Sequence, residues 1–190
     1  MWPGGDHVVF ERNGTMDVAA VLERMKKVRQ SRRYSDEPVA KADLDALLEV
    51  AQWSGSAKNT QPWHFIVIQD KETLAKLAAL RPNIDWLSGV PLAIALVFDG
   101  HETVLESFDE GRIYERLAIA ATLLGLGAGT AWFLGAKEEE QAKELLGVPS
   151  ERTMHSVVAI GYVDKQADQM PGRNYVGRKP LSEIVSYEKM

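Results

Sequence analysis

A group of basic and amide side chains stands near the amino terminus, where residues 28–35 read VRQSRRYS. The wider run 24–33 holds six basic side chains and no acid, although the chain of 190 residues has a formal net charge of −5. Five polar side chains follow one another where a helix should end: Arg29, Gln30, Ser31, Arg32 and Arg33. Forked guanidinium groups and neutral donors that converge on one spot are suited to hold a phosphate monoester. The sequence therefore predicts an anion site here.

The positive charge is confined to this run. Without it, the remainder of the chain carries a formal charge of −11, so a broad surface for binding nucleic acid is not expected. Arg24, Lys26 and Lys27 have a simpler explanation, because cations complement the dipole at the carboxyl end of a helix. The anion site is therefore predicted from the later residues of the run.

A second polar patch, SGSAKNTQP at 54–62, comes directly before the apolar and β-branched run 63–69. Its amide and hydroxyl side chains, Ser56, Asn59 and Gln61, would stand at the entrance of a strand, where they could hydrogen-bond a flat polar heterocycle. The same side chains could instead satisfy only the backbone of their own loop. Both interpretations remain open at this point.

Other chemistries find little support in the sequence. The stretch GLGAGT at 125–130 follows no predicted strand and has Thr130 in place of a third glycine, so a helix end that turns into a strand is favoured over a dinucleotide-binding fingerprint. The four histidines lie far apart and predict no metal site. Glu102, Glu106 and Asp109 are expected on a solvated helix face. The absence of cysteine excludes thiol chemistry.

The elements that must position these residues follow from the spacing of apolar side chains. Periodicity predicts helices over 17–29, near 44–53 and over 72–80, 113–124 and 138–146, and strands over 63–69, 92–98, 129–134 and 155–163. The strand at 92–98 lacks polar alternation, so we expect it to be covered on both faces. The acidic stretch 102–110 is expected to be exposed. This order favours an α+β fold, a sheet with helices packed on it and an extended carboxyl-terminal arm.

One domain is expected over residues 17–190, preceded by a flexible arm at 1–16 that lacks the pattern of a secretory signal. The uncharged stretch 117–136 is long enough to cross a bilayer, but its glycines divide it, and a buried helix explains it better. No membrane association is expected, and the cysteine-free composition is compatible with a cytoplasmic location.

Four short blocks together resemble the nitroreductase family of FMN-dependent oxidoreductases. They are VRQSRRYSDEPV at 28–39, SAKNTQPWHFIV at 56–67, LGLGAGTAW at 124–132 and GRKPLSEIV at 177–185. The blocks occur in the family's order and spacing. The resemblance implies an α+β homodimer with a central mixed or antiparallel sheet flanked by helices. It also implies two FMN sites at the subunit interface and a carboxyl-terminal arm that wraps the partner.

The resemblance also implies which side chains contact FMN: Arg29, Gln30, Ser31, Arg32, Ser56, Asn59, Gln61, Trp132, Phe133, Leu134, Gly135 and Arg178. Arg29, Gln30 and Arg32 would hold the phosphate and the ribityl region, and Arg178 would join them from the tail. Ser56 and Asn59 would come from the other subunit, and residues 132–135 would line the isoalloxazine ring. The chain departs from the family at two points. Gln30 stands where Ser or Thr is common, with Ser31 one place later, and Leu134 stands where some members have an acid.

The activity that the resemblance implies is transfer of reducing equivalents from NAD(P)H, through the flavin, to a nitroaromatic, a quinone or another flat acceptor in a ping-pong cycle. Because the flavin carries this chemistry, no catalytic side chain is singled out. Two alternatives share the scaffold. One is a specialised enzyme that modifies flavin or removes halogen from an aromatic compound, and the other is a flavin-binding dimer without turnover. The pocket for the nicotinamide and the acceptor is expected to be shaped by loops such as 81–90 and 99–112.

Overall fold

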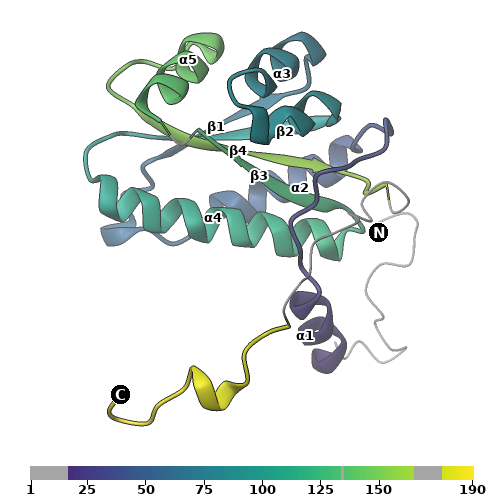
Figure 1. Ribbon diagram of the computed structural model, residues 1–190, viewed down its shortest axis with the longest axis vertical. Helices are drawn as coiled ribbons and strands as arrows, with labels where there is room; N and C mark the ends of the chain where they lie inside the picture. Colours follow the sequence, from purple (N-terminus) through teal and green to yellow (C-terminus); the bar gives the residue numbers. More distant parts are fainter. Residues whose placement is uncertain (1–16, 134, 165–176) are drawn as a thin grey trace.

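The computed structural model describes residues 17–133, 135–164 and 177–190 of the chain (Figure 1). The amino-terminal arm expected at 1–16 lies outside the described residues. Four strands form one antiparallel sheet in the order β1-β2-β4-β3. Their bounds are Trp63–Ile68 for β1, Leu92–Phe98 for β2, Gly127–Trp132 for β3 and Thr153–Gly161 for β4. The predicted α+β class is confirmed, and each predicted strand is found within two residues of its expected start.

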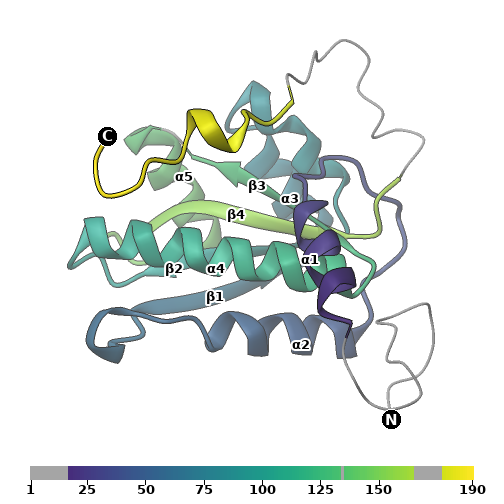
Figure 2. The same ribbon diagram turned by 90° about the horizontal axis from the view of Figure 1, so that it is seen from below.

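Helices cover both faces of this sheet. The α-helices are α1 (Val18–Lys26), α2 (Lys41–Gln52), α3 (Lys71–Ala78), α4 (Thr103–Leu123) and α5 (Ala136–Leu146), and the 3₁₀ segments are η1 (Ala57–Asn59), η2 (Pro82–Gly89) and η3 (Leu181–Glu183). Figure 1 shows α3 and α5 on one face and α2 and α4 on the other. In Figure 2, α2 and α4 lie side by side against the sheet, and the two helices contact each other.

Strand β2 is buried on both faces, as its continuous apolar run predicts. Its small side chains, Ala93 and Ala95, face the core formed with α3 and α5. Its larger side chains, Ile94, Leu96 and Phe98, face the core formed with α2 and α4. The sheet is therefore the shared wall of two apolar cores. In the part of the chain that the structure describes, no helix has the length and apolar character needed to cross a membrane.

Helix α4 differs from the sequence prediction. An exposed acidic segment and a separate apolar helix were expected, but one helix of 21 residues spans both. The prediction that Glu106 and Asp109 lie on a solvated face was wrong, since each is only 3% exposed, and Glu110 is 1% exposed. Each carboxylate has a polar partner: Asp109 pairs with Arg112 of the same helix, and Glu110 contacts Ser156 and His155 of β4. Glu106 accepts hydrogen bonds from the backbone amides of Gly100 and His101 at 3.2 and 3.0 Å.

The segment 30–35, which carries most of the predicted anion site, docks on the open edge of β3. Gln30 forms a parallel bridge with Ala128, and the Ser31 amide donates to the Ala128 carbonyl at 2.8 Å. Tyr34 forms an antiparallel bridge with the chain just beyond β4, and its hydroxyl donates to the Ser31 carbonyl at 2.9 Å. The backbone of this segment is therefore fixed by the sheet.

The GLGAGT stretch 125–130 is a helix end that turns into a strand, as the sequence analysis favoured. Gly125 has a φ of +77° after the last turn of α4, and β3 begins at Gly127. Gly129 has a different role. A Cβ atom added there would overlap the carbonyl oxygen of Ser31. The glycine thus permits the close approach of segment 30–35 to β3.

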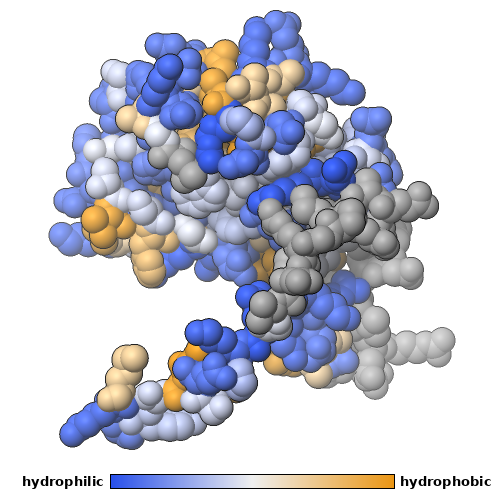
Figure 3. Space-filling model, in the orientation of Figure 1, coloured by the Kyte–Doolittle hydropathy of each residue, from blue (hydrophilic) through white to orange (hydrophobic). Residues whose placement is uncertain are grey.

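Two parts of the chain extend from the body. Helix α1 stands beyond the carboxyl-terminal half of α4, and residues 177–190 form an arm that runs away from the sheet (Figure 1). Both expose apolar side chains. Leu22 of α1 is 52% exposed, and Leu181 and Ile184 of the arm are 73% and 61% exposed. Figure 3 shows apolar patches along the arm and over α4. Exposed apolar patches of this kind often mark surfaces that contact another protein chain.

Candidate functional site

A cavity of about 550 Å³ opens beside the docked segment 30–35. Arg32 and Arg33 line it from that segment, and Asn83, Trp86 and Ser88 line it from η2. Its size is typical of a small-molecule site. Guanidinium groups beside an amide, a hydroxyl and an indole suit a ligand that combines an anionic end with a flat heteroaromatic group. Asp85 and Asp164 also line the cavity, so its charge is mixed.

The predicted anion-binding residues are only partly brought together. Arg32, which is partly buried, faces the cavity, whereas the Arg29 guanidinium donates to the Lys26 and Val28 carbonyl oxygens, each at 2.7 Å, at the end of α1. Arg178 lies in the exposed arm. Arg32 and Arg33 thus line one cavity, and Arg29 is turned to the end of α1 in the single chain. That these arginines hold an anion stays a prediction.

The side chains of Gln30 and Ser31 differ in burial. These two residues form one of the points at which the chain departs from the family pattern. Ser31 is 7% exposed, and its side chain lies against Gly127 of β3. Gln30 is exposed, and its Nε2 donates to the Thr130 carbonyl at 3.2 Å. A ligand outside the sheet edge can therefore reach the Gln30 side chain, while the Ser31 side chain serves the packing of the segment on β3.

Strand β3 ends at Trp132, and Phe133 follows it. The Trp132 carbonyl accepts from Arg81 Nη1 at 2.6 Å, and the Phe133 amide donates to the His155 carbonyl at 2.8 Å. The Trp132 side chain is 41% exposed, whereas Phe133 is 3% exposed and belongs to the core. Trp132 is thus available to a ligand and Phe133 is not. Of the other predicted contacts, Gly135 is the N-cap of α5, and Leu134 lies outside the described residues.

The loop 56–61 is strained. Lys58, Asn59 and Gln61 all have positive φ angles, of 53°, 56° and 49°, which non-glycine residues rarely adopt. The Ser56 hydroxyl accepts from the Gln61 amide at 2.9 Å and closes the loop. The Asn59 and Gln61 side chains are exposed. Strain of this kind persists where the surrounding structure fixes it, and it often accompanies functional loops.

The loop and the cavity lie at opposite ends of the sheet. The loop leads into Trp63, which pairs with Phe98 at one end of β2. Segment 30–35 pairs with β3 near Ala128, which is in register with Ile160 of β4 and, through it, with Leu92 at the other end of β2. Seven residues of extended strand separate these ends by about 20 Å. One chain therefore does not bring its own loop to its own cavity.

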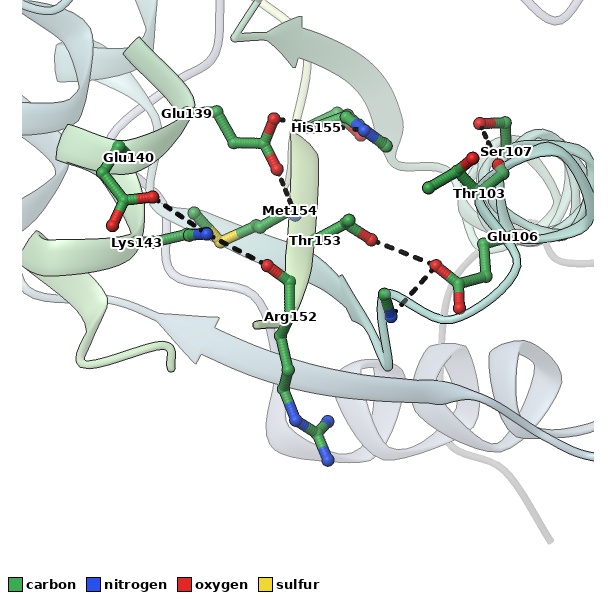
Figure 4. A network of polar contacts seen from close by, with 12 residues as sticks. Thr103, Glu106, Ser107, Glu139, Glu140, Lys143, Arg152, Thr153, Met154 and His155 are labelled. Atoms are coloured by element: carbon green, nitrogen blue, oxygen red, sulfur yellow. Dashed lines mark hydrogen bonds and ion pairs between the residues drawn. The ribbon is translucent and has the colours of Figure 1, made fainter. Parts of the chain in front are cut away.

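A polar network joins α4, β4 and α5 (Figure 4). His155 Nδ1 lies 3.3 Å from Glu110 Oε2, and its Nε2 lies 4.0 Å from Glu139 Oε2. The Ser156 hydroxyl donates to Glu110 Oε1 at 2.5 Å. Glu139 Oε1 accepts from the Met154 amide at 3.0 Å. The network fixes the start of β4, where the His155 carbonyl accepts the hydrogen bond from the Phe133 amide.

The imidazole of His155 is partly buried among carboxylates. The hydrogen bond with Glu110 raises the pKa of His155 above its ordinary value, helped by the charges of Glu110, Glu139 and Glu106 and opposed by burial. A histidine whose pKa is raised on folding stabilises the fold fully below its unfolded pKa, and this contribution is lost as the pH rises through the folded value.

The free energy of unfolding of the cofactor-free protein should therefore fall as the pH rises from about 6 to about 8. The part due to His155 should amount to a few tenths to about 1 kcal/mol, the range of partly exposed ion pairs. Urea unfolding at both pH values, for the wild type and for His155→Gln, measures it. The variant should show a flatter dependence than the control His64→Gln, whose side chain is exposed on β1. Equal slopes for all three proteins would contradict the assignment.

Sequence reasoning named 81–90 as a loop that shapes the pocket but singled out no residue of η2. Arg81, Asn83 and Trp86 carry no motif, and their segment shows only a short apolar pattern. Asn83 and Trp86 share a cavity with segment 30–35 only because α3 and η2 pack against the same face of the sheet, whereas Arg81 donates to the Trp132 carbonyl. Within the ranges that the structure describes, no three side chains of the His, Asp and Glu types are grouped as a metal site.

The chain is similar to known proteins of one family. The model of the nitroreductase family matches residues 26–81, which include segment 30–35 and loop 56–61. A protein of Archaeoglobus fulgidus, provisionally named NADH dehydrogenase/NAD(P)H nitroreductase, is 33% identical over 147 residues, or 74% of this chain and 83% of that protein. The FMN reductase (NAD(P)H) of Bacillus subtilis is 29% identical over 118 residues, or 58% of this chain and 47% of that protein.

Solved structures show the same fold. The structure of an FMN-dependent nitroreductase from Clostridium difficile superposes with a TM-score of 0.77 and 26% sequence identity. The superposition covers 89% of this chain and 99% of that one. The likeness therefore extends well beyond the residues that the family model matches.

Proposed function

The chain belongs to the nitroreductase family, and from this premise we propose that it passes reducing equivalents from NAD(P)H through FMN to a flat acceptor such as a nitroaromatic or a quinone. The observation that carries the proposal is the cavity between Arg32 and η2, where an anion-binding side chain and a set of amide, hydroxyl and indole groups meet. FMN has a matching anionic end and a matching heteroaromatic end.

The residues around the cavity fit FMN. Arg32 would hold the phosphate through charge-assisted hydrogen bonds, with Gln30 beside it. Asn83 and Ser88 would offer donors and acceptors to the polar edge of the ring. Segment 30–35 is held on β3 by backbone hydrogen bonds, so these contacts are preorganised. Bound FMN supplies the redox chemistry, which leaves the chain the tasks of binding, orienting and excluding water.

The second half of each site would come from a second copy of the chain. Ser56 and Asn59 lie at the far end of the sheet from the cavity of their own chain, so in the proposed homodimer they would reach the cavity of the partner. The exposed apolar side chains of α1 and the arm would be covered in the same assembly, and Arg178 would approach the phosphate from the arm. Isologous dimers of this kind use the same two surfaces twice.

Trp132 would supply the site with a second aromatic surface, beside Arg81 at the start of η2. Its indole is 41% exposed at the end of β3, where a flat nicotinamide or acceptor ring could stack. Because one face would serve both partners, we expect the oxidised nicotinamide to leave before the acceptor enters, which is a ping-pong order. A cytoplasmic location and a single domain over 17–190 remain part of the proposal.

The absorption spectrum of the purified protein tests this function. The protein, or the protein after addition of FMN and removal of the excess, should be yellow, and NADH or NADPH should bleach the flavin band without oxygen. Addition of a quinone or a nitroaromatic compound should restore the band. A colourless protein that retains no added FMN would contradict the proposal, and tight binding without reduction by either nicotinamide would indicate a flavin-binding dimer without turnover.

A further inference from the structure

Loop 56–61 lies over a cavity and not over a packed core. A cavity of about 360 Å³ lies between the loop and the first turns of α4, with Ala57, Lys58 and Thr60 on one side and Leu105 and Asp109 on the other. The strained backbone of the loop is therefore not supported by a packed core at this point. Its position must be set at its two ends.

The exit of the loop is fixed by the sheet. The Asp99 amide donates to the Pro62 carbonyl at 3.0 Å, and Trp63 pairs with Phe98. These are backbone contacts that continue the ladder between β1 and β2. The exit therefore has a position determined by the central strand of the fold.

The entrance of the loop is held by two arginines of α4. Arg112 Nη1 donates to the Gly55 carbonyl at 3.2 Å, and Arg116 Nη1 donates to the Trp53 carbonyl at 2.9 Å. Both carbonyls lie in the turn that connects α2 with the loop. A guanidinium group suits this role because several donors share one rigid plane.

Arg112 is itself held in place. Its Nη1 lies 3.3 Å from Asp109 Oδ1, and the Asp109 side chain is only 4% exposed. Its guanidinium carbon lies 4.2 Å from the centre of the Phe108 ring. A buried carboxylate and an aromatic face thus orient the side chain, although Arg112 itself is 44% exposed. A merely solvated surface arginine would have neither constraint.

We infer that Arg112 and Arg116 are positioning residues for the flavin site of the partner subunit. They fix the entrance of the loop that carries Ser56 and Asn59, and in the proposed dimer this loop completes the cavity of the other copy. The inference rests on the proposed function. It adds that a side chain on α4 controls a cofactor site to which it does not belong.

Replacement of Arg112 by Gln should raise the dissociation constant of FMN by about 3- to 10-fold, the effect of losing one hydrogen bond that orients the loop. Arg116→Gln should act in the same direction, and Arg112→Lys should recover part of the loss. The control is Lys76→Gln, which removes an exposed cation on α3 that pairs with Glu72. FMN titration of the cofactor-free dimer and its thermal melting are measured together. A fall in melting temperature without a change in FMN affinity would overturn the inference.

Mixed dimers decide whether Arg112 acts across the interface. One chain carries Arg112→Gln, the other carries Arg32→Ala, and different affinity tags on the two chains allow the mixed dimer to be purified. If Arg112 serves the partner's site, both defects fall in one site, and the mixed dimer should bind one FMN with wild-type affinity. If Arg112 serves its own chain, both sites are impaired and the inference is wrong. Failure of the wild-type dimer to bind FMN would instead contradict the proposed function.

Discussion

Replacement of Arg32 by Ala is expected to raise the dissociation constant of FMN by about 10- to 100-fold, the range for loss of a charge-assisted hydrogen bond where water is partly excluded. Arg32 lines the cavity, and the backbone on each side of it is held by the sheet edge. The lost contact therefore cannot be replaced by a small movement of the chain. Quenching of FMN fluorescence on titration into cofactor-free protein measures the constant.

Two further variants make this result specific. Lys27→Ala removes an exposed cation of the same basic run at the end of α1, and it should leave FMN affinity unchanged. Arg29→Ala should have a smaller effect than Arg32→Ala, because the Arg29 guanidinium is engaged by the Lys26 and Val28 carbonyl groups at the end of α1 and just beyond it. If Arg32→Ala binds FMN as tightly as Lys27→Ala does, the assignment of the phosphate to this cavity is wrong.

Replacement of Gly129 by Ala is expected to damage both the fold and the cofactor site. An added Cβ overlaps the Ser31 carbonyl oxygen, so segment 30–35 must move away from β3. Overpacking of this kind costs about 1–3 kcal/mol of unfolding free energy. Because the same segment carries Arg32, FMN affinity should fall as well. Urea unfolding of the cofactor-free protein, followed by FMN titration under native conditions, measures the two effects separately.

Gly111→Ala is the matched control for this variant. Gly111 lies in the middle of α4, and a Cβ added there meets no atom within 4 Å. Alanine should therefore stabilise the helix by about 0.5–1 kcal/mol and leave FMN affinity unchanged. A Gly129→Ala protein that is as stable as Gly111→Ala and binds FMN equally well would show that the docking of segment 30–35 is not needed.

The sequence predicts the regular elements well because their signals are local. The unbroken apolar run of β2 indicates a strand buried on both faces, and the positive φ of Gly125 suits the turn that precedes β3. The failure at Glu110 concerns partners that lie far away along the chain. Glu110 looks like a surface acid until Ser156 and His155 are brought beside it by β4. The periodicity of apolar residues within one segment does not reveal which side chains from other segments will lie beside it.

The candidate site divides in the same way. Arg32 and loop 56–61 belong to short motifs, so the sequence could indicate them. Arg81 and Asn83 reach the site only through the packing of η2 on the sheet, and they carry no motif. Gly129 looked like part of a simple turn, and its second role appears only when the Ser31 backbone is seen against it. Side chains that act through tertiary packing are therefore the ones that sequence analysis missed.

The separation of loop and cavity by the length of β2 has a consequence for how activity depends on dilution. A single chain would carry the cavity of one flavin site at one end of its sheet and the loop that completes the other flavin site at the opposite end. In the proposed dimer, dissociation of the two chains would also release the bound flavin. Specific activity should then decline once the protein is diluted below its self-association constant, and added FMN should shift that threshold to lower concentrations.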